Sequence, residues 1–274
     1  MNGCIPESRV MKKYLELIKI NVKTQLIWRT DAFFSMISVC AKMLFAYLLW
    51  GIIFEGKETV AGFSYSMMIS YYVLNSFFSS MDMSGSISYE MDDKIRNGSF
   101  SKYMIIPVLP QAYFLCQTIG KALFYVVFTF TASFIWIFIF KFDFVITANA
   151  LHVVSAFTLF LLGYFFMQQF HYYLGLLTFK FKNIFLFLMI KDNIFSLISG
   201  AVIPLVLLPH EVISVFKFLP FYYISYLPTM ILLGRNSEEV PQAFITMLLW
   251  ILILSVVNPA TYKYHRTKFE GAGI

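Results

Sequence analysis

Residues 112–140 read AYFLCQTIGKALFYVVFTFTASFIWIFIF, a long apolar run that holds one charged side chain, Lys121. An α-helix rises about 1.5 Å per residue, so about 20 apolar residues cross the roughly 30 Å hydrocarbon core of a membrane. The stretch is therefore predicted to span a bilayer as a helix. Because it is longer than one crossing needs, it must tilt, bend or project from the membrane.

The rest of the chain has the composition of a protein whose outer solvent is lipid. Its 274 residues are 59% hydrophobic and only 13% charged, and the mean hydropathy is +0.72. Soluble domains are about 25% charged, because polar side chains must cover their surface. Too few polar residues are available here for that purpose. The composition therefore argues against a soluble enzyme and predicts an all-α membrane protein.

Six apolar runs are each long enough for one crossing, and no soluble domain is inserted between them. The predicted spans are residues 32–54, 63–81, 112–140, 144–175, 184–208 and 241–258. They predict a single transmembrane domain of six helices over residues 1–274. The first thirty residues lack the apolar core of a cleavable signal peptide, so the first span is expected to act as its own insertion signal.

Residues 9–27 differ from the spans because one helical face is charged and another is apolar. The charged face holds Lys12, Glu16, Lys19 and Lys23, and the apolar face Met11, Leu15, Ile18, Val22 and Leu26. This pattern is typical of an amphipathic elbow helix that lies along an anionic membrane surface. The alternative is a solvated helix packed on a partner protein.

The distribution of Lys and Arg predicts the orientation in the membrane. Fourteen of the 21 basic residues fall in the N-terminal segment, loop 82–111, loop 176–183 and the tail after 258, whereas four fall in the connections on the other side. Basic residues are concentrated on the cytoplasmic side of membrane proteins. Both termini are therefore expected in the cytoplasm. The net charge of +6 is then a topology signal and does not indicate nucleic-acid binding.

The longest loop on the basic side is expected to be structured over residues 84–106. Its first part has helical character and dense charge, with Glu90, Asp92, Asp93, Lys94 and Arg96. Asn97-Gly98 supplies left-handed positions that stop a helix, and Ser99 can cap a second short helix. The predicted layout of helix, sharp turn and helix suits a docking element. The alternative is a solvated loop.

The segment after residue 200 is apolar but is broken by four prolines, Pro204, Pro209, Pro220 and Pro228. Prolines at this density cannot belong to one straight membrane helix. Broken backbone at membrane depth is tolerated where protein or a water-filled cavity satisfies it. We therefore predict a span that ends near residue 208 and short re-entrant helices over residues 209–234 on the outer side.

Three charged residues inside the predicted spans are candidates for the transport pathway, because isolated charge in hydrocarbon is costly. They are Lys42, Lys191 and Asp192. As neighbours on one helix, Lys191 and Asp192 are expected to point in different directions and not to neutralise each other. The alternative for all three is snorkelling or structural pairing within the bundle. His171 is expected to make an interhelical hydrogen bond.

No catalytic or metal-binding arrangement is found among the residues. Cys4, Cys40 and Cys116 form no spaced pair, and no acid pair or nucleophile motif stands out. Gly120-Lys121 lacks the upstream glycine and the following Ser or Thr of a phosphate loop. Any ATP-driven step therefore requires another chain.

Two of these segments resemble signatures of a known family, the permeases of type-two (ABC-2) ABC transporters, in the branch of about 260–270 residues. KIRNGSFSKYMIIPV (94–108) resembles its signature between the second and third spans. SGAVIPLVLLPHEVISVFKFLPFYYISYLPTMILLG (199–234) resembles its second, proline-rich signature. The tract from Leu26 to Asp31 resembles its entry to the first span, and Gly271-Ala272-Gly273 its terminal glycines.

The chain departs from the family pattern at three positions. Lys94 stands where the family usually has an acid, Phe100 replaces the usual Leu, and Trp28 sits where Tyr is typical. The acid that faces the ATPase is therefore expected to be Glu90, Asp92 or Asp93.

The resemblance implies a six-span exporter subunit of the bacterial inner membrane with an elbow helix, a cytoplasmic coupling helix and re-entrant outer helices. It implies two ABC ATPase subunits, which bind ATP and Mg²⁺, and a second permease subunit, identical or homologous. The ATPase-coupling positions would be the three candidate acids together with Ile95, Arg96, Asn97, Gly98, Ser99 and Tyr103. An amphipathic, lipid-like or antimicrobial-type cargo is expected. The alternatives are a secondary transporter or channel and a membrane-embedded lipid-modifying enzyme.

Overall fold

The computed structural model describes residues 7–141, 143–181 and 183–267, which are mostly helical, with turns, an extended connection before residue 150 and one β-bridge between Val60 and Phe63. The first helices are α1 Glu7–Ile27, α2 Arg29–Ile53, α3 Tyr65–Met81, α4 Gly85–Arg96, α5 Ser101–Ile105 and α6 Pro110–Phe140. They are followed by α7 Ala150–Leu177, α8 Phe185–Ile198, η1 Leu205–Leu207, α9 His210–Phe216, η2 Pro220–Tyr223, α10 Tyr226–Leu232, η3 Ser237–Glu239 and α11 Val240–Arg266. The expected all-α architecture is confirmed for these residues.

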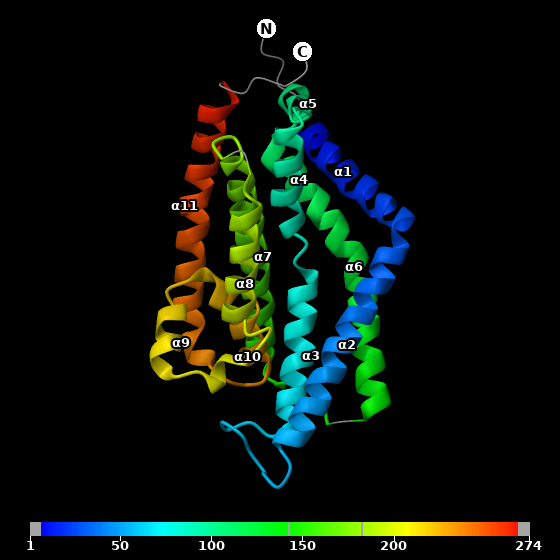
Figure 1. The fold of residues 1–274 in the computed structure, drawn as a ribbon, viewed down its shortest axis with the longest axis vertical. Coiled ribbons are helices and arrows are strands. Elements are labelled where there is room, and N and C mark those ends of the chain that lie inside the picture. Colours follow the sequence, from blue (N-terminus) through cyan, green and yellow to red (C-terminus); the bar gives the residue numbers. More distant parts are fainter. Residues whose placement is uncertain (1–6, 142, 182, 268–274) are drawn as a thin grey trace.

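The helices form an elongated bundle in which α6, α7 and α11 run along most of the length (Figure 1). The start of α1, the short α5 and the end of α11 lie at one end, which we call the α5 end. The broken segment with α9 and α10 lies toward the opposite end, the α9 end. α1 slants away from the α5 end and packs on α6. The coupling region predicted over 84–106 therefore lies toward the same end of the bundle as the first and last described residues.

Four segments of the described residues are long and apolar enough to cross a membrane by themselves: α2, α6, α7 and Ser237–Arg266, which is η3 continued by α11. A fifth is added if α9 and the η2–α10 segment, bent by 93°, count as one broken span. The predicted spans 63–81 and 184–208 correspond to shorter helices, of 17 residues in α3 and 14 in α8. Fourteen residues cover only about 21 Å. Six full-length spanning helices are therefore not confirmed.

The predicted span 184–208 is too long because the helix stops at Ile198. Gly200 has a φ of 69°, which is left-handed and ends the helix. The carbonyls that α8 leaves free accept hydrogen bonds from α3: Asn75 Nδ2 donates to Ser199 O over 3.0 Å, and Tyr71 Oη to Gly200 O over 2.9 Å. A Cβ at Gly200 would overlap the Tyr71 hydroxyl. Packing against α3 thus fixes where α8 ends.

The predicted span 144–175 begins later than expected, because residues 144–149 are extended. Val145 N donates to Ser70 Oγ over 2.9 Å, and Thr147 N donates to Leu232 O over 2.7 Å. Asn149 then caps α7 by accepting a hydrogen bond from Leu151 N. These bonds satisfy the backbone of the connection without helix formation.

The four prolines break the chain after α8 as the sequence predicts. Pro204 and Pro209 precede η1 and α9, Pro220 opens η2, and Pro228 lies in the first turn of α10. Every residue of α10 is buried, and the segment packs on α7 and α3. The backbone of α10 is therefore covered by protein, which is the condition for interrupted backbone at membrane depth, whereas α9 has no buried residue.

Candidate functional site

The helix α4 is held tightly against α7 by its apolar face. Ile87, Met91 and Ile95 are buried on that face, one turn apart, as helical spacing requires. Opposite Met91, α7 has Gly175. A Cβ built at Gly175 would lie 2.7 Å from Met91 Sδ and 2.8 Å from Met91 Cβ. The absence of a side chain at Gly175 is what lets α4 approach α7 so closely.

The turn between α4 and α5 depends on Gly98, whose φ is 75°. Asn97, in contrast, has a φ of −90°, so only one of the two expected left-handed positions is left-handed. Asn97 Oδ1 accepts a hydrogen bond from Ser99 N over 3.0 Å, and Ser101 Oγ donates to Gly98 O over 3.1 Å. Ser99 does not cap α5, because the helix starts two residues later, at Ser101. The side chain of Asn97 closes the turn in its place.

Two of the three candidate acids are bound to residues of neighbouring helices, whereas Asp93 Oδ2 accepts a hydrogen bond from the exposed Asn97 Nδ2 over 3.3 Å. Glu90 Oε1 pairs with Lys94 at 3.3 Å, and Glu90 Oε2 accepts from Gln117 Nε2 at 2.8 Å. Burial, and next the charge of Glu90, raise the pKa of Tyr103, whose hydroxyl stays protonated and donates to Glu90 Oε1 over 3.5 Å. These contacts hold α4 to α5 and α6.

Asp92 is the second engaged acid, and Asp93 is the exposed one. Asp92 is buried; its Oδ1 accepts from Thr178 Oγ1 at 3.2 Å and its Oδ2 lies 3.3 Å from Arg96 Nε. Asp93, Arg96 and Asn97 are exposed at the α5 end of α4. Of the nine predicted coupling positions, these three offer polar side chains to a partner, whereas Ile95 and Tyr103 are buried.

A second polar cluster connects α4 to α8 through α7. Tyr89 Oη donates to Asp192 Oδ2 over 2.9 Å. Lys191 Nζ lies 3.3 Å from His171 Nε2, and Ser88 Oγ lies 3.1 Å from His171 Nδ1. An ammonium group only donates, so His171 accepts at Nε2 and carries its proton on Nδ1 toward Ser88. The expected interhelical hydrogen bond of His171 is present.

The expectation that Lys191 and Asp192 cannot neutralise each other is wrong, because Lys191 Nζ contacts Asp192 Oδ1. Their Cβ atoms do point apart, but four methylene groups let the lysine ammonium reach back to the neighbouring carboxylate. The pair therefore belongs to the cluster between α4, α7 and α8.

Lys42 lies elsewhere, in a cleft of about 750 Å³ between α2, α3 and the end of α8. We call it the α2–α3 groove. Its lining is rich in polar side chains, namely Ser35, Ser38, Lys42, Tyr72, Asn75, Ser76, Ser79, Ser80, Asp82 and Ser196. The apolar lining includes Phe45, Leu49 and Val202. The structure thus separates Lys42 from the two charges that the sequence grouped with it.

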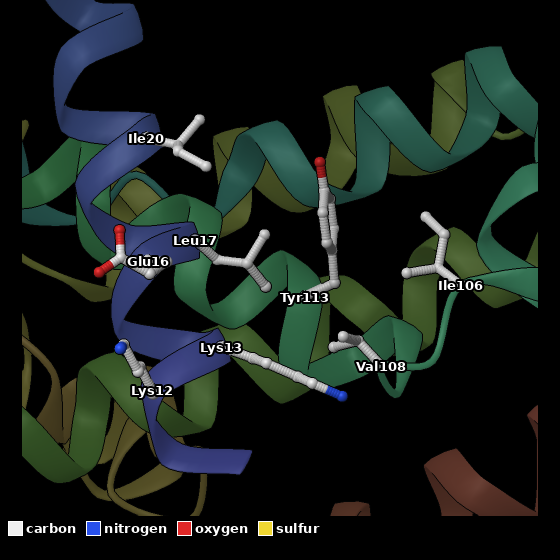
Figure 2. A pocket seen from close by; sticks show the side chains of 8 residues that line it. All are labelled: Lys12, Lys13, Glu16, Leu17, Ile20, Ile106, Val108 and Tyr113. Atoms are coloured by element: carbon white, nitrogen blue, oxygen red, sulfur yellow. The ribbon is translucent and has the colours of Figure 1, made fainter. Parts of the chain in front are cut away.

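A different cleft of about 590 Å³ lies under α1 and is lined largely by apolar side chains. Figure 2 shows Leu17 of α1 extending toward Tyr113 of α6 there, with Lys12 and Lys13 on the same helix as Leu17. Further along, α1 touches α6 at Gly120, where a Cβ would lie 2.7 Å from Asn21 Cβ. The elbow segment therefore packs closely on α6 at Gly120, and an apolar cleft lies beside its first half.

Sequence reasoning missed the groove as a unit, as well as Gly175 and the partners of His171. The serines at 35 and 38, and those at 76 and 79, recur at helical spacing together with Lys42 and Asn75. That periodicity is a signal for polar stripes on two helices. The periodicity does not predict which of these polar stripes face each other in the folded bundle.

Among the described residues, no group of three or more His, Cys, Asp or Glu side chains is placed to hold a metal ion.

Comparison with known protein families finds a match for most of the chain. A family model described as an ABC-2 family transporter protein matches residues 40–273 of the 274-residue chain. No curated protein matches the chain.

Proposed function

Because this chain belongs to the ABC-2 family of transporter proteins, we propose that it is the membrane-spanning subunit of an ATP-driven exporter. Its family and its long apolar helices make it a multi-pass membrane protein. Members of this family are transport subunits that do not themselves catalyse a reaction. The observation that supports the proposal best is the α4–α5 unit at the α5 end of the bundle. Its inner face is anchored by buried contacts, and its outer face offers Asp93, Arg96 and Asn97.

In the proposed mechanism, a partner ATPase moves α4 and the bundle transmits the movement. Near the middle of α8, Tyr89 of α4 donates a hydrogen bond to Asp192. At the C-terminal end of α8, Asn75 of α3 donates a hydrogen bond to Ser199 O. A displacement of α4 therefore shifts α8 against α3, and α3 forms one wall of the α2–α3 groove. Opening and closing of this groove is the movement that a transport cycle needs.

The partners follow from the same proposal. Two ABC ATPase subunits would bind ATP and Mg²⁺ and dock on the α4–α5 unit of each permease. A second permease subunit, identical or homologous, would complete the pathway beside the α2–α3 groove, whose lining residues Phe45, Leu49 and Val202 are exposed. Membrane lipid would contact α1, whose residues Met11, Leu15, Ile20, Leu26 and Ile27 are exposed beside its lysines.

The α5 end is proposed to face the cytoplasm of a bacterial cell, because it carries most of the basic residues. Single cysteines at positions 58 and 236 are expected to react with an impermeant maleimide added to intact cells, in a chain whose own cysteines are replaced. Cysteines at 97 and 265 are expected to react only after lysis. Position 142 is also predicted to lie outside, and it falls outside the described residues. Labelling of position 97 in intact cells would contradict this orientation.

Copurification tests the proposed function most directly. We expect the tagged chain to bring down an ABC ATPase, and Arg96→Glu to weaken that association more as salt is raised. Reversing an exposed charge at a docking surface removes an attraction of about 0.2–1 kcal/mol and adds a repulsion, and both are screened by salt. The association is measured as ATPase activity bound per permease at increasing salt concentration.

Lys263→Glu is the matched control, because Lys263 is exposed at the same end of the molecule on α11. It should leave ATPase binding unchanged. Equal losses in the two variants would mean that net charge, and not the α4–α5 unit, governs association. Transport by the purified chain without any ATPase would support a secondary transporter or channel. Chemical turnover of lipid by the purified chain would support a membrane enzyme.

A further inference from the structure

The α2–α3 groove places hydrogen-bond donors around a single cation near the middle of a spanning helix. Lys42 is thirteen positions after Arg29, where the 25-residue α2 begins, which is about 20 Å along the helix. Its side chain lines the groove together with Ser38 one turn earlier and with Asn75 and Ser79 of α3. The hydroxyl, amide and ammonium groups of these residues can all donate hydrogen bonds.

Lys42 has no carboxylate partner among residues 7–141, 143–181 and 183–267. The acid that lines the groove, Asp82, follows the end of α3, and its Oδ1 accepts from Ser84 N over 3.0 Å. A charge at this depth is costly unless it meets an opposite charge or water. The groove therefore has an unmatched positive site with a carboxylate at its α5 end.

A second copy of the chain packed through these helices would not supply the missing charge. In α2 and α3 the one acidic residue is Asp31, eleven positions before Lys42 and therefore about 16 Å away along the helix. A parallel partner would bring its own Asp31 to the same wrong depth. An identical partner therefore brings no acid from these two helices to the depth of Lys42, and a molecule inside the groove is the source of the matching charge that we consider.

We propose that the α2–α3 groove binds anionic amphiphiles, with a carboxylate or phosphate group at Lys42. The Ser38 hydroxyl and the second amide hydrogen of Asn75 donate hydrogen bonds to the remaining oxygens of that group, while the first amide hydrogen of Asn75 stays on Ser199 O. The apolar chain lies against Phe45, Leu49 and Val202, which line the same cleft. This inference rests on the proposed function, because it names the chemical class of cargo for that pathway.

Photolabelling of the purified full-length chain without an ATPase tests the inference. Three diazirine-bearing probes of equal chain length are compared in phosphatidylcholine nanodiscs: palmitic acid, palmityl alcohol and palmityl amine. Labelled positions are mapped by mass spectrometry. We expect the acid to label α2 and α3 in the groove more strongly than the alcohol or the amine. Lys42→Met should lower labelling by the acid about tenfold to a hundredfold, as expected for loss of a charge-assisted hydrogen bond.

Two variants serve as controls. Lys42→Arg keeps the charge and should keep labelling by the acid. Lys57→Met removes the same charge from the exposed loop between α2 and α3 and should have no effect. Equal labelling by the three probes, or undiminished labelling in Lys42→Met, would overturn the inference.

A parallel experiment in phosphatidylglycerol nanodiscs separates two sources of the anion. Competition by phosphatidylglycerol would assign the site to an anionic membrane lipid, and absence of competition to a single-chain amphiphile. Both outcomes keep the anionic class, provided that Lys42→Met loses labelling. A failure of this experiment leaves ATPase docking untouched, whereas loss of copurifying ATPase would contradict the proposed function itself.

Discussion

Gly175→Ala is expected to uncouple ATP hydrolysis from transport while leaving the chain inserted in the membrane. The added Cβ would lie 2.8 Å from Met91 Cβ, a distance at which α4 or α7 must move. Forcing one extra methyl group into a packed contact costs about 1–3 kcal/mol. Because α4 carries Asp93 and Arg96, its displacement moves the proposed docking surface. The measurement is ATP hydrolysis by the copurifying ATPase, with and without the permease, in parallel with transport.

Gly51→Ala is the matched control for this substitution. Gly51 also lies in a spanning helix, α2, but a Cβ there would find its nearest neighbour, Tyr65 Oη, at 4.0 Å. The same methyl group should therefore leave coupling and thermal stability unchanged. If Gly175→Ala retained full coupling, tight packing of α4 on α7 would not be needed for the transmission that we propose.

Gly98→Val is expected to lower permease-stimulated ATP hydrolysis about fivefold or more, with normal membrane insertion. Gly98 has a φ of 75°, where the Cβ of a β-branched residue clashes with the backbone. Holding a non-glycine residue in such a conformation costs about 1–3 kcal/mol, which corresponds to roughly a 5- to 150-fold shift between two states. The turn would open, and α5 would leave its place beside α4. Stimulation is measured at fixed permease and ATPase concentrations.

Gly98→Asn separates the backbone requirement from other effects of a side chain. Asparagine tolerates left-handed backbone better than other residues with a side chain. Most stimulation should therefore persist in this variant. Equal losses for Val and Asn would point to the volume of the side chain and not to its φ. Full activity in both would mean that the α4–α5 turn takes no part in coupling.

The segments whose structure depends on their own residues were predicted well. The run 112–140 forms most of α6, since a long apolar stretch can satisfy its backbone in lipid only as a helix. The helix, turn and helix around Gly98 follow from local backbone preference. The four prolines interrupt the chain after α8, because proline removes a donor and fixes φ wherever it occurs. None of these outcomes requires a contact with a distant residue.

Other features were decided by contacts between helices that lie far apart in the sequence. The end of α8 at Ile198, ten residues earlier than expected, depends on Tyr71 and Asn75 of α3. The roles of Glu90 and Asp92 as internal partners depend on Gln117 and Thr178. From the sequence, Glu90, Asp92 and Asp93 were equivalent candidates for the acid that faces the ATPase. The folded structure shows that Asp93 is the exposed one of the three.

The amino-acid sequence by itself determined that this is a helical membrane protein, that prolines interrupt its chain after α8, and which family it belongs to. Hydropathy, glycine and proline act through the solvent and the local backbone, so their effects can be read along the chain. Only the tertiary structure decided that Lys42 faces a hydroxyl-lined groove, that Asp192 joins α8 to α4 and that Lys191 joins α8 to α7. The physical reason is that helix packing chooses the partner of a charged side chain, and the sequence around each charge does not specify which helix lies opposite.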